Sequence, residues 1–429
     1  MSGNLPIIVY FNGTFINREN GAHARFWEQL TWISENYANV TLYSFSDHPD
    51  CPWGAVEIER FHQLFPKVEL ALERRSRKLR TIRRLKNAAM ALAPETTREL
   101  LTWRVRGATP VYEALVARGP HLLLVNYVDA LTELNGVDVS RCIIETHDVK
   151  FLIYSKRYGK SLADLRVLGK FRSEAFLLGV AGGLIAIAAP EAAMFKLWYP
   201  TKPIFYIPKY PRAEAGPGPK DKIFKYDILF LGSEHHFNVE GIVDFIHGND
   251  WSKEYSLAVA GRVCQVARVR EAVAGRPNVE LLGFVQDADA LYASAKLVIS
   301  PVDGTGLKIK VVDALSAGVP VLASEHTMNG LPSGYDGCVF PLTREMAEKL
   351  IADPQALGKA SARAIRYAAT LSSAGHVEEL RTFIDSKMFA HNPASEVQEE
   401  RRPGAVTSQF SAMGVFEGRQ TARSLRRAL

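Results

Sequence analysis

The chain has 429 residues, of which 47% are hydrophobic and 23% charged, so it is long enough for two globular domains. Its formal net charge of +6 favours anionic partners such as nucleotides, nucleic acid or lipid headgroups, without choosing among them. The four cysteines form no CxxC pair, and no apolar run approaches the ~20 residues that span a bilayer, which excludes a zinc or redox motif and a transmembrane helix. We therefore expect a cytoplasmic protein that is at most peripheral on the inner face of the plasma membrane.

Short apolar runs rich in β-forming residues alternate with helical segments along the chain. These runs are Ile7–Phe11, Val40–Phe45, His121–Tyr127, Cys142–Thr146, Leu184–Ala188, Ile204–Ile207, Tyr226–Leu231, Ser256–Ala260, Val279–Phe284, Leu297–Ser300, Val319–Ala323 and Cys338–Pro341. Most are continuous rather than alternating, which is typical of strands buried on both faces of a parallel sheet. The pattern predicts an α/β fold with two Rossmann-like, doubly wound parallel-sheet domains that face a central cleft.

A segment rich in Pro and Gly separates the two halves of the chain and is typical of an interdomain linker. After about residue 388 the apolar pattern decays into a polar and basic sequence. We therefore predict an N-terminal domain, a linker, a C-terminal domain and a disordered basic tail, at residues 1–208, 209–223, 224–387 and 388–429.

The small pair Gly21-Ala22 follows the first predicted strand and suits the start of the first long helix, with Arg25 one turn further on. A plain helix start explains the pair equally well. It does not belong to a Gly-x-Gly-x-x-Gly fingerprint, so an NAD site is not supported.

A basic segment runs from Glu73 to Lys86, with Leu79, Ile82 and Leu85 at intervals of three. This spacing predicts a basic amphipathic helix. Two interpretations stay open: a solvated helix packed on its own domain, or docking of Arg74–Lys86 on an anionic membrane surface. Nucleic-acid binding is not expected, because no nucleic-acid module accompanies the patch.

The predicted strand Cys142–Thr146 ends in the titratable pair His147-Asp148. In a parallel sheet this position faces the cleft, although such a pair can also merely cap a loop. The sequence has no Gly-x-Ser-x-Gly nucleophile elbow, which argues against a Ser-His-Asp hydrolase.

The first predicted strand of the second half ends in Gly232-Ser233, and Asn238 lies near the start of the next helix. His235 and His236 lie between them, but adjacent side chains cannot project the same way. A metal site is therefore not expected there.

A Gly-rich turn, Gly304-Thr305-Gly306, follows the strand Leu297–Ser300 and precedes a helix that begins near Leu307. The turn lets backbone amides approach a ligand, and the helix N-terminus offers unpaired N–H groups to an anion. Lys308 and Lys310 add two cations. Asp313 shares a helix face with Lys310 and can accept hydrogen bonds from ribose hydroxyls, so the segment outlines a nucleotide-diphosphate site.

The segment 303–322 resembles the nucleotide-sugar site of group 1, or family 4, glycosyltransferases with the GT-B fold, in the branch that carries Gly-x-Gly-x-Lys-x-Lys before the second acidic residue. The chain departs from the commoner pattern, because Asp313 replaces the usual Glu and Thr305 stands where the first acid often stands. The strands ending in Gly-Ser and His-Asp are further features of the family.

The resemblance implies a metal-independent hexosyltransferase that needs no cofactor and uses a nucleotide-diphosphate sugar as co-substrate. It implies transfer to a glycan or lipid-linked acceptor with retention of configuration, in surface polysaccharide or glycolipid synthesis. The implied catalytic residues are His147, Lys310 and Asp313. The implied donor-binding residues are Gly21, Ala22, Gly232, Ser233, Asn238, Gly304, Thr305, Gly306 and Lys308.

An alternative is a nucleotide-sugar epimerase, or a non-catalytic sugar-nucleotide-binding protein, on the same scaffold. An epimerase needs several cleft carboxylates, and the first half of the sequence offers few at its predicted strand ends, with Glu145 and Asp148 as a close pair.

Overall fold

The computed structural model describes residues 5–76, 81, 85, 109–134, 137–211, 224–248, 254–304 and 306–389. The first half of the described chain forms a seven-stranded sheet in the order β3-β2-β1-β4-β5-β6-β7, with every pair parallel. Its strands are β1 (Ile7–Tyr10), β2 (Val40–Phe45), β3 (Val68–Glu73), β4 (Leu122–Asn126), β5 (Cys142–Glu145), β6 (Gly183–Ala186) and β7 (Ile204–Tyr206).

The second half forms a six-stranded parallel sheet in the order β10-β9-β8-β11-β12-β13. Its strands are β8 (Tyr226–Leu231), β9 (Leu257–Ala260), β10 (Val279–Gly283), β11 (Ala295–Ser300), β12 (Val321–Ala323) and β13 (Val339–Pro341). The two parallel sheets confirm the predicted α/β architecture.

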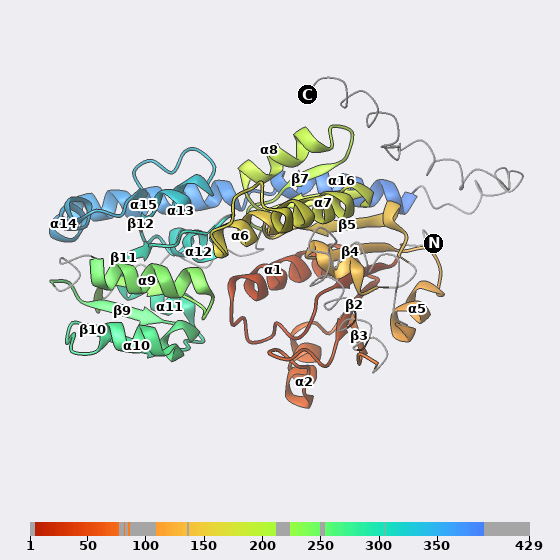
Figure 1. Cartoon of the computed structure of the whole chain (residues 1–429), viewed down its shortest axis with the longest axis horizontal. Coiled ribbons are helices and arrows are strands. Elements are labelled where there is room, and N and C mark those ends of the chain that lie inside the picture. The colour runs from red at the N-terminus through yellow and green to blue at the C-terminus, as the bar shows by residue number, and fades with distance from the viewer. Residues whose placement is uncertain are drawn as a thin grey trace, which may run out of the picture. The chain divides into compact units, whose positions relative to one another are not determined.

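Helices flank both sheets (Figure 1). Those of the first half are α1 (Gly21–Asn36), α2 (Ala55–Leu64), α5 (Pro110–Val116), α6 (Lys150–Arg157), α7 (Leu165–Val180) and α8 (Ala189–Trp198), with the short 3-10 helices η1 (Val128–Thr132) and η2 (Val139–Arg141). Those of the second half are η4 (Arg262–Gln265), α9 (His236–Gly248), α10 (Ala267–Val273), α11 (Ala288–Ala293), α12 (Ile309–Ser316), α13 (Glu325–Asn329), α14 (Arg344–Ala352), α15 (Pro354–Leu371) and α16 (Gly375–Phe389). None of the helices in the described ranges is both long and apolar enough to cross a membrane.

The central strands are buried because helices cover both faces of each sheet. All residues of β1, β4 and β9 are buried, as their continuous apolar sequences predict. The edge strand β3 is absent from the predicted runs. Its sequence, Val-Glu-Leu-Ala-Leu-Glu, is only partly buried, because an edge strand leaves one side partly in water.

The position of β3 corrects the predicted start of the basic helix at Glu73. Glu73 ends this strand instead of opening a helix, and the Arg75 side chain is buried. Most of the segment Arg74–Lys86 lies outside the described residues, so the predicted amphipathic helix stays a prediction.

Both sheets belong to one compact unit, Met1–Ile384, and a second unit comprises 385–429, of which the structure describes only the end of α16. Within the first unit, α16 packs on the first sheet: Phe383 contacts Phe205 with ring centroids 5.4 Å apart, and His376 lies against Tyr206. The linker at 209–223 and the tail at 388–429 stay predictions, because 212–223 and 390–429 lie outside the described ranges.

Candidate active site

A cleft of about 1100 Å³ is lined by loops at the carboxyl ends of strands from both sheets, the edge at which parallel sheets bind ligands. Ten of the twelve predicted site residues line it: Gly21, Ala22, His147, Gly232, Ser233, Asn238, Gly304, Lys308, Lys310 and Asp313. Gly306 is close to the cleft without lining it, and Thr305 lies outside the described residues.

Lys310 is on the first turn of α12 and lies half-buried against the second sheet. Its Nζ donates to Asn238 Oδ1 at 2.8 Å and lies 4.4 Å from the centre of the Phe230 ring, and Asn238 Nδ2 donates to Ser233 Oγ at 3.0 Å. Burial, and then the charge of Lys308, lowers the pKa of Lys310 to about 7. Since no carboxylate among the described residues pairs with this ammonium, an anion in the cleft would supply the missing charge.

Lys308 immediately precedes α12 and lies near two carboxyl groups, the half-buried Asp148 and the buried Glu191. Burial lowers the pKa of Lys308 to about 8, against the opposing effect of both carboxyl groups. Burial also raises the pKa of Asp148 to about 6, and burial together with Asp148 raises that of Glu191 well above its usual value. No local sequence pattern indicates Glu191, because it lies on α8 and comes near Asp148 only in the folded chain.

Gly306 makes the close packing of this cluster possible. Its φ of 75° lies in the left-handed region, and a Cβ at this position would lie 2.8 Å from Asp148 Oδ1. Lys308 Nζ donates to the carbonyl of Gly306 at 3.3 Å, so the turn and the cation hold each other. A Cβ on Gly304 would lie 3.2 Å from the same Nζ.

Asp313 is on the same helix, three residues beyond Lys310, and lines the cleft. It accepts from Lys209 Nζ at 2.6 Å, and Lys209 also lies 3.5 Å from Glu28. Lys209 is buried although its sequence context is typical of a linker. The Asp313 carboxylate at the cleft is therefore paired with Lys209, which lies at the end of the first half of the chain.

The start of α1 confirms the predicted role of Gly21 and Ala22 as a helix start. Asn20 caps the helix by accepting from the backbone N–H of His23 at 3.0 Å. The first turn of α1 approaches α12: a Cβ on Gly21 would lie 3.6 Å from Ile309. Arg25 points away from the cleft, however, because its guanidinium is fully buried and donates to Glu145 at 2.6 Å.

His147 lies at the carboxyl end of β5 with a left-handed φ of 56°, in a tight turn closed by a hydrogen bond from Asp148 N to Thr146 O. Its ring stacks on Tyr127 with centroids 4.3 Å apart, and Tyr127 has a left-handed φ of 70°. Burial lowers the pKa of His147 to about 4, so the imidazole is neutral at neutral pH. Tyr127 and His147 thus follow neighbouring strands in strained backbone conformations, and their stacking fixes the His147 ring at the cleft.

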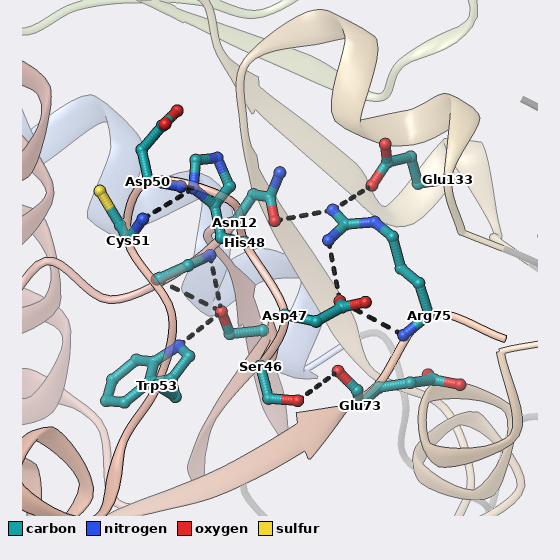
Figure 2. Close-up of polar contacts among 12 residues, drawn as sticks. Asn12, Ser46, Asp47, His48, Asp50, Cys51, Trp53, Glu73, Arg75 and Glu133 are labelled. Carbon is teal, nitrogen blue, oxygen red and sulfur yellow. Dashed lines mark hydrogen bonds and ion pairs between the residues drawn. The ribbon is translucent and has the colours of Figure 1, made fainter. Parts of the chain in front are cut away.

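Arg75 organises the first-sheet end of the cleft, where Figure 2 shows it reaching loops that follow three other strands. Its guanidinium donates to Asp47 at 3.1 Å, to Asn12 at 2.8 Å and to Glu133 at 2.9 Å. Its Cζ lies 4.0 Å from the centre of the Phe45 ring. Asn12 and Glu133 line the cleft, so Arg75 supports its wall from behind.

Arg262 is another cleft residue that the sequence did not indicate. It follows β9, and its guanidinium donates to Glu19 at 2.6 Å and to Glu234 at 2.7 Å. The pairs join the loop before α1 to the loops of the second sheet. Among the described residues, no group of three or more His, Cys, Asp or Glu side chains is arranged to hold a metal ion.

The fold is shared with solved glycosyltransferases of the GT-B type. WaaG, a glycosyltransferase involved in lipopolysaccharide biosynthesis, is 15% identical with a TM-score of 0.56 over 89% of this chain and 99% of its own. TarM from S. aureus is 9% identical, with a TM-score of 0.60 over 89% of this chain and 100% of its own. HepE from Anabaena, solved with UDP-glucose, is 14% identical, with a TM-score of 0.54 over 90% and 100%.

Residues 225–352, which include β8 to α14, match the family described as Glycosyl transferases group 1. None of the curated proteins compared with the chain matches it. Residues 225–352 are therefore similar to the group 1 glycosyltransferases, and the chain shares the GT-B type of fold with the solved structures.

Proposed function

We propose that the protein is a metal-independent, retaining hexosyltransferase that moves a sugar from a nucleotide-diphosphate donor to an acceptor hydroxyl. The observation that supports this most is the pair of half-buried lysines at the start of α12. Lys308 and Lys310 both line the cleft with lowered pKa values, and Lys310 has no carboxylate partner among the described residues. A diphosphate would supply a negative charge beside Lys310 and would also attract Lys308.

The nucleotide diphosphate would lie against the second sheet. Gly232, Ser233 and Asn238 are at the end of β8, where Ser233 and Asn238 already form a polar pair beside Lys310. The backbone N–H groups at the start of α12 would add to the lysines, because a helix N-terminus attracts anions. Asp313, held by Lys209, would accept from ribose hydroxyls.

Transfer breaks the bond between the anomeric carbon and the diphosphate oxygen and forms a bond to the acceptor oxygen on the same face of the sugar. The acceptor proton passes to the departing phosphate, so no protein nucleophile is needed. Lys308 and Lys310 would stabilise the charge that develops on the leaving group. His147, neutral in the cleft, would bind the donor sugar or the acceptor.

A donor panel tests the proposal. The protein is incubated with UDP-, GDP- and ADP-sugars and a mixture of glycan and lipid-linked acceptors, with and without EDTA, and the anomeric configuration of the product is determined by NMR. Transfer with retention that EDTA leaves unchanged supports the proposal. Absence of both transfer and nucleotide binding across the panel contradicts it, and isomerisation of a sugar nucleotide without acceptor favours the epimerase alternative.

We propose that the acceptor belongs to surface polysaccharide or glycolipid synthesis. The protein would reach it by docking on an anionic membrane through the segment Arg74–Lys86. Flotation with anionic vesicles tests this by comparing the wild type with a charge-reversed segment. Arg75 has to be kept in the variant, because its buried guanidinium stabilises the fold. Equal flotation of the two proteins would count against membrane docking.

A further inference from the structure

A chain of buried polar side chains leads from Arg25 to His147. Arg25 Nε donates to Glu145 Oε1 at 2.6 Å, and Gln29 Nε2 donates to Glu145 Oε2. Asn126 Nδ2 donates to Gln29 Oε1 at 2.8 Å, and Asn126 Oδ1 lies 2.8 Å from His147 Nε2. All five side chains are buried, and only His147 and Asn126 line the cleft.

The carboxylate at the inner end fixes the orientation of every group in this chain. Glu145 is paired with Arg25 and can only accept, so the amide group of Gln29 that faces it must be the NH₂. The oxygen of Gln29 therefore faces Asn126, which must present its own NH₂ to that oxygen. The oxygen of Asn126 then faces the ring of His147 and can only accept from it.

We infer that this chain fixes His147 as the Nε2–H tautomer and so leaves Nδ1 as an acceptor that selects a ligand with a hydroxyl at this point of the cleft. The inference rests on the proposed function, since the ligand is taken to be a sugar. Asn126 and Gln29 are positioning residues, which act through the histidine. His147 Nδ1 forms no hydrogen bond to any described residue, so the ligand is its available partner.

The surroundings of the ring keep it in the neutral state that this selection needs. Burial has the largest effect on the pKa of His147 and lowers it to about 4, while Glu145 raises it and Arg25 and Lys150 lower it. The ring plane is fixed by stacking on Tyr127. A neutral imidazole with its only N–H turned inward cannot donate to the ligand, so a substrate lacking the matching hydroxyl leaves Nδ1 unpaired.

The tautomer is measured directly by long-range ¹H–¹⁵N correlation NMR on the full chain labelled with ¹⁵N-histidine, with His147→Gln to assign the signal. The expected result at pH 7 is a single neutral tautomer with a slowly exchanging Nε2 proton. Asn126→Ala should make this proton exchange rapidly. Tyr210→Phe is the matched control and should not, because it removes a different donor to Glu145, at 2.8 Å, and leaves the amide chain intact.

A protonated Nδ1 in the wild type would overturn the inference, as would a His147 signal that Asn126→Ala leaves unchanged. This readout needs neither donor nor turnover. The tautomer can therefore be confirmed while the proposed function fails, or be refuted while transfer is observed.

Asn126→Asp supplies a second readout, in kinetics. A carboxylate beside Nε2 stabilises the imidazolium and raises the pKa of His147 from about 4. Below the raised pKa, Nδ1 carries a proton and can only donate, so the sugar hydroxyl has to reverse its hydrogen bond to the ring. With UDP-glucose as the probe donor, kcat/KM of the variant should be lower at pH 6 than at pH 8, while that of the wild type changes little. A loss that is equal at all pH values would mean that Asn126 only supports the fold, and would overturn its assigned role.

Discussion

Replacing Lys310 with methionine removes one charge from the cleft and keeps an unbranched side chain to pack on Phe230. In the proposed complex, Lys310 donates to the diphosphate and stabilises the leaving group. Losing a preorganised charged donor of this kind costs about 2–3 kcal/mol of transition-state stabilisation, which is about a 30–160-fold loss of kcat/KM. His235→Ala should lose much less, because His235 borders the cleft without contacting Lys310.

The same substitution should stabilise the ligand-free protein. The pKa of Lys310 falls from 10.5 to about 7 on folding, so between these pH values the unfolded chain binds more protons and the stability of the wild type rises with pH. Methionine carries no such charge, so thermal unfolding at pH 7 should occur at a higher temperature in Lys310→Met. Lower stability together with unchanged kcat/KM would refute the role of Lys310 as an anion-binding cation.

Binding of a nucleoside diphosphate at pH 8 should take up protons, because the anion raises the pKa values of Lys308 and Lys310, which are about 8 and 7 in the ligand-free protein. Calorimetry in buffers of different ionisation enthalpy measures the uptake. Zero uptake would contradict this prediction. Gly306→Ala should destabilise the protein by more than the roughly 1–3 kcal/mol of left-handed strain, because its Cβ would lie 2.8 Å from a carboxylate oxygen. Gly275→Ala is the control for denaturant unfolding, since its φ of 76° is nearly the same and nothing lies within 4 Å of the added Cβ; equal losses would refute the steric part. Arg75→Ala should cost about 1–3 kcal/mol in the same assay, because two half-buried carboxylates lose their ion-pair partner, and a loss below about 0.5 kcal/mol would contradict this.

The sheets and the second-sheet part of the site could be predicted because their signals are local. Continuous apolar runs mark strands covered on both faces, and the motif from Gly304 to Asp313 lies within ten residues of chain. The start of α1 at Gly21 is equally local. The edge strand β3 was not predicted because Glu69 and Glu73 interrupt its apolar residues, so it lacks the continuous apolar pattern of a covered strand.

The supporting parts of the site could not be predicted because their partners are distant in sequence. Arg25 pairs with Glu145, 120 residues away, and Arg75 with Glu133, 58 residues away. From sequence alone, a basic residue beside a predicted loop is expected to contact a ligand or solvent, because its acidic partner in the fold is not known. Lys209 shows the same limit, since its linker-like sequence gives no indication of its contact with Asp313.

The central claim is that the cleft binds a diphosphate through the lysines at the start of α12. Isothermal titration calorimetry of the wild type with UDP, GDP and ADP, each beside its nucleoside, tests it most directly. At least one diphosphate should bind at pH 7 with clearly higher affinity than its nucleoside, and Lys310→Met should remove most of that difference. A nucleoside that binds as tightly as its diphosphate, or no binding across the whole panel, would contradict the claim.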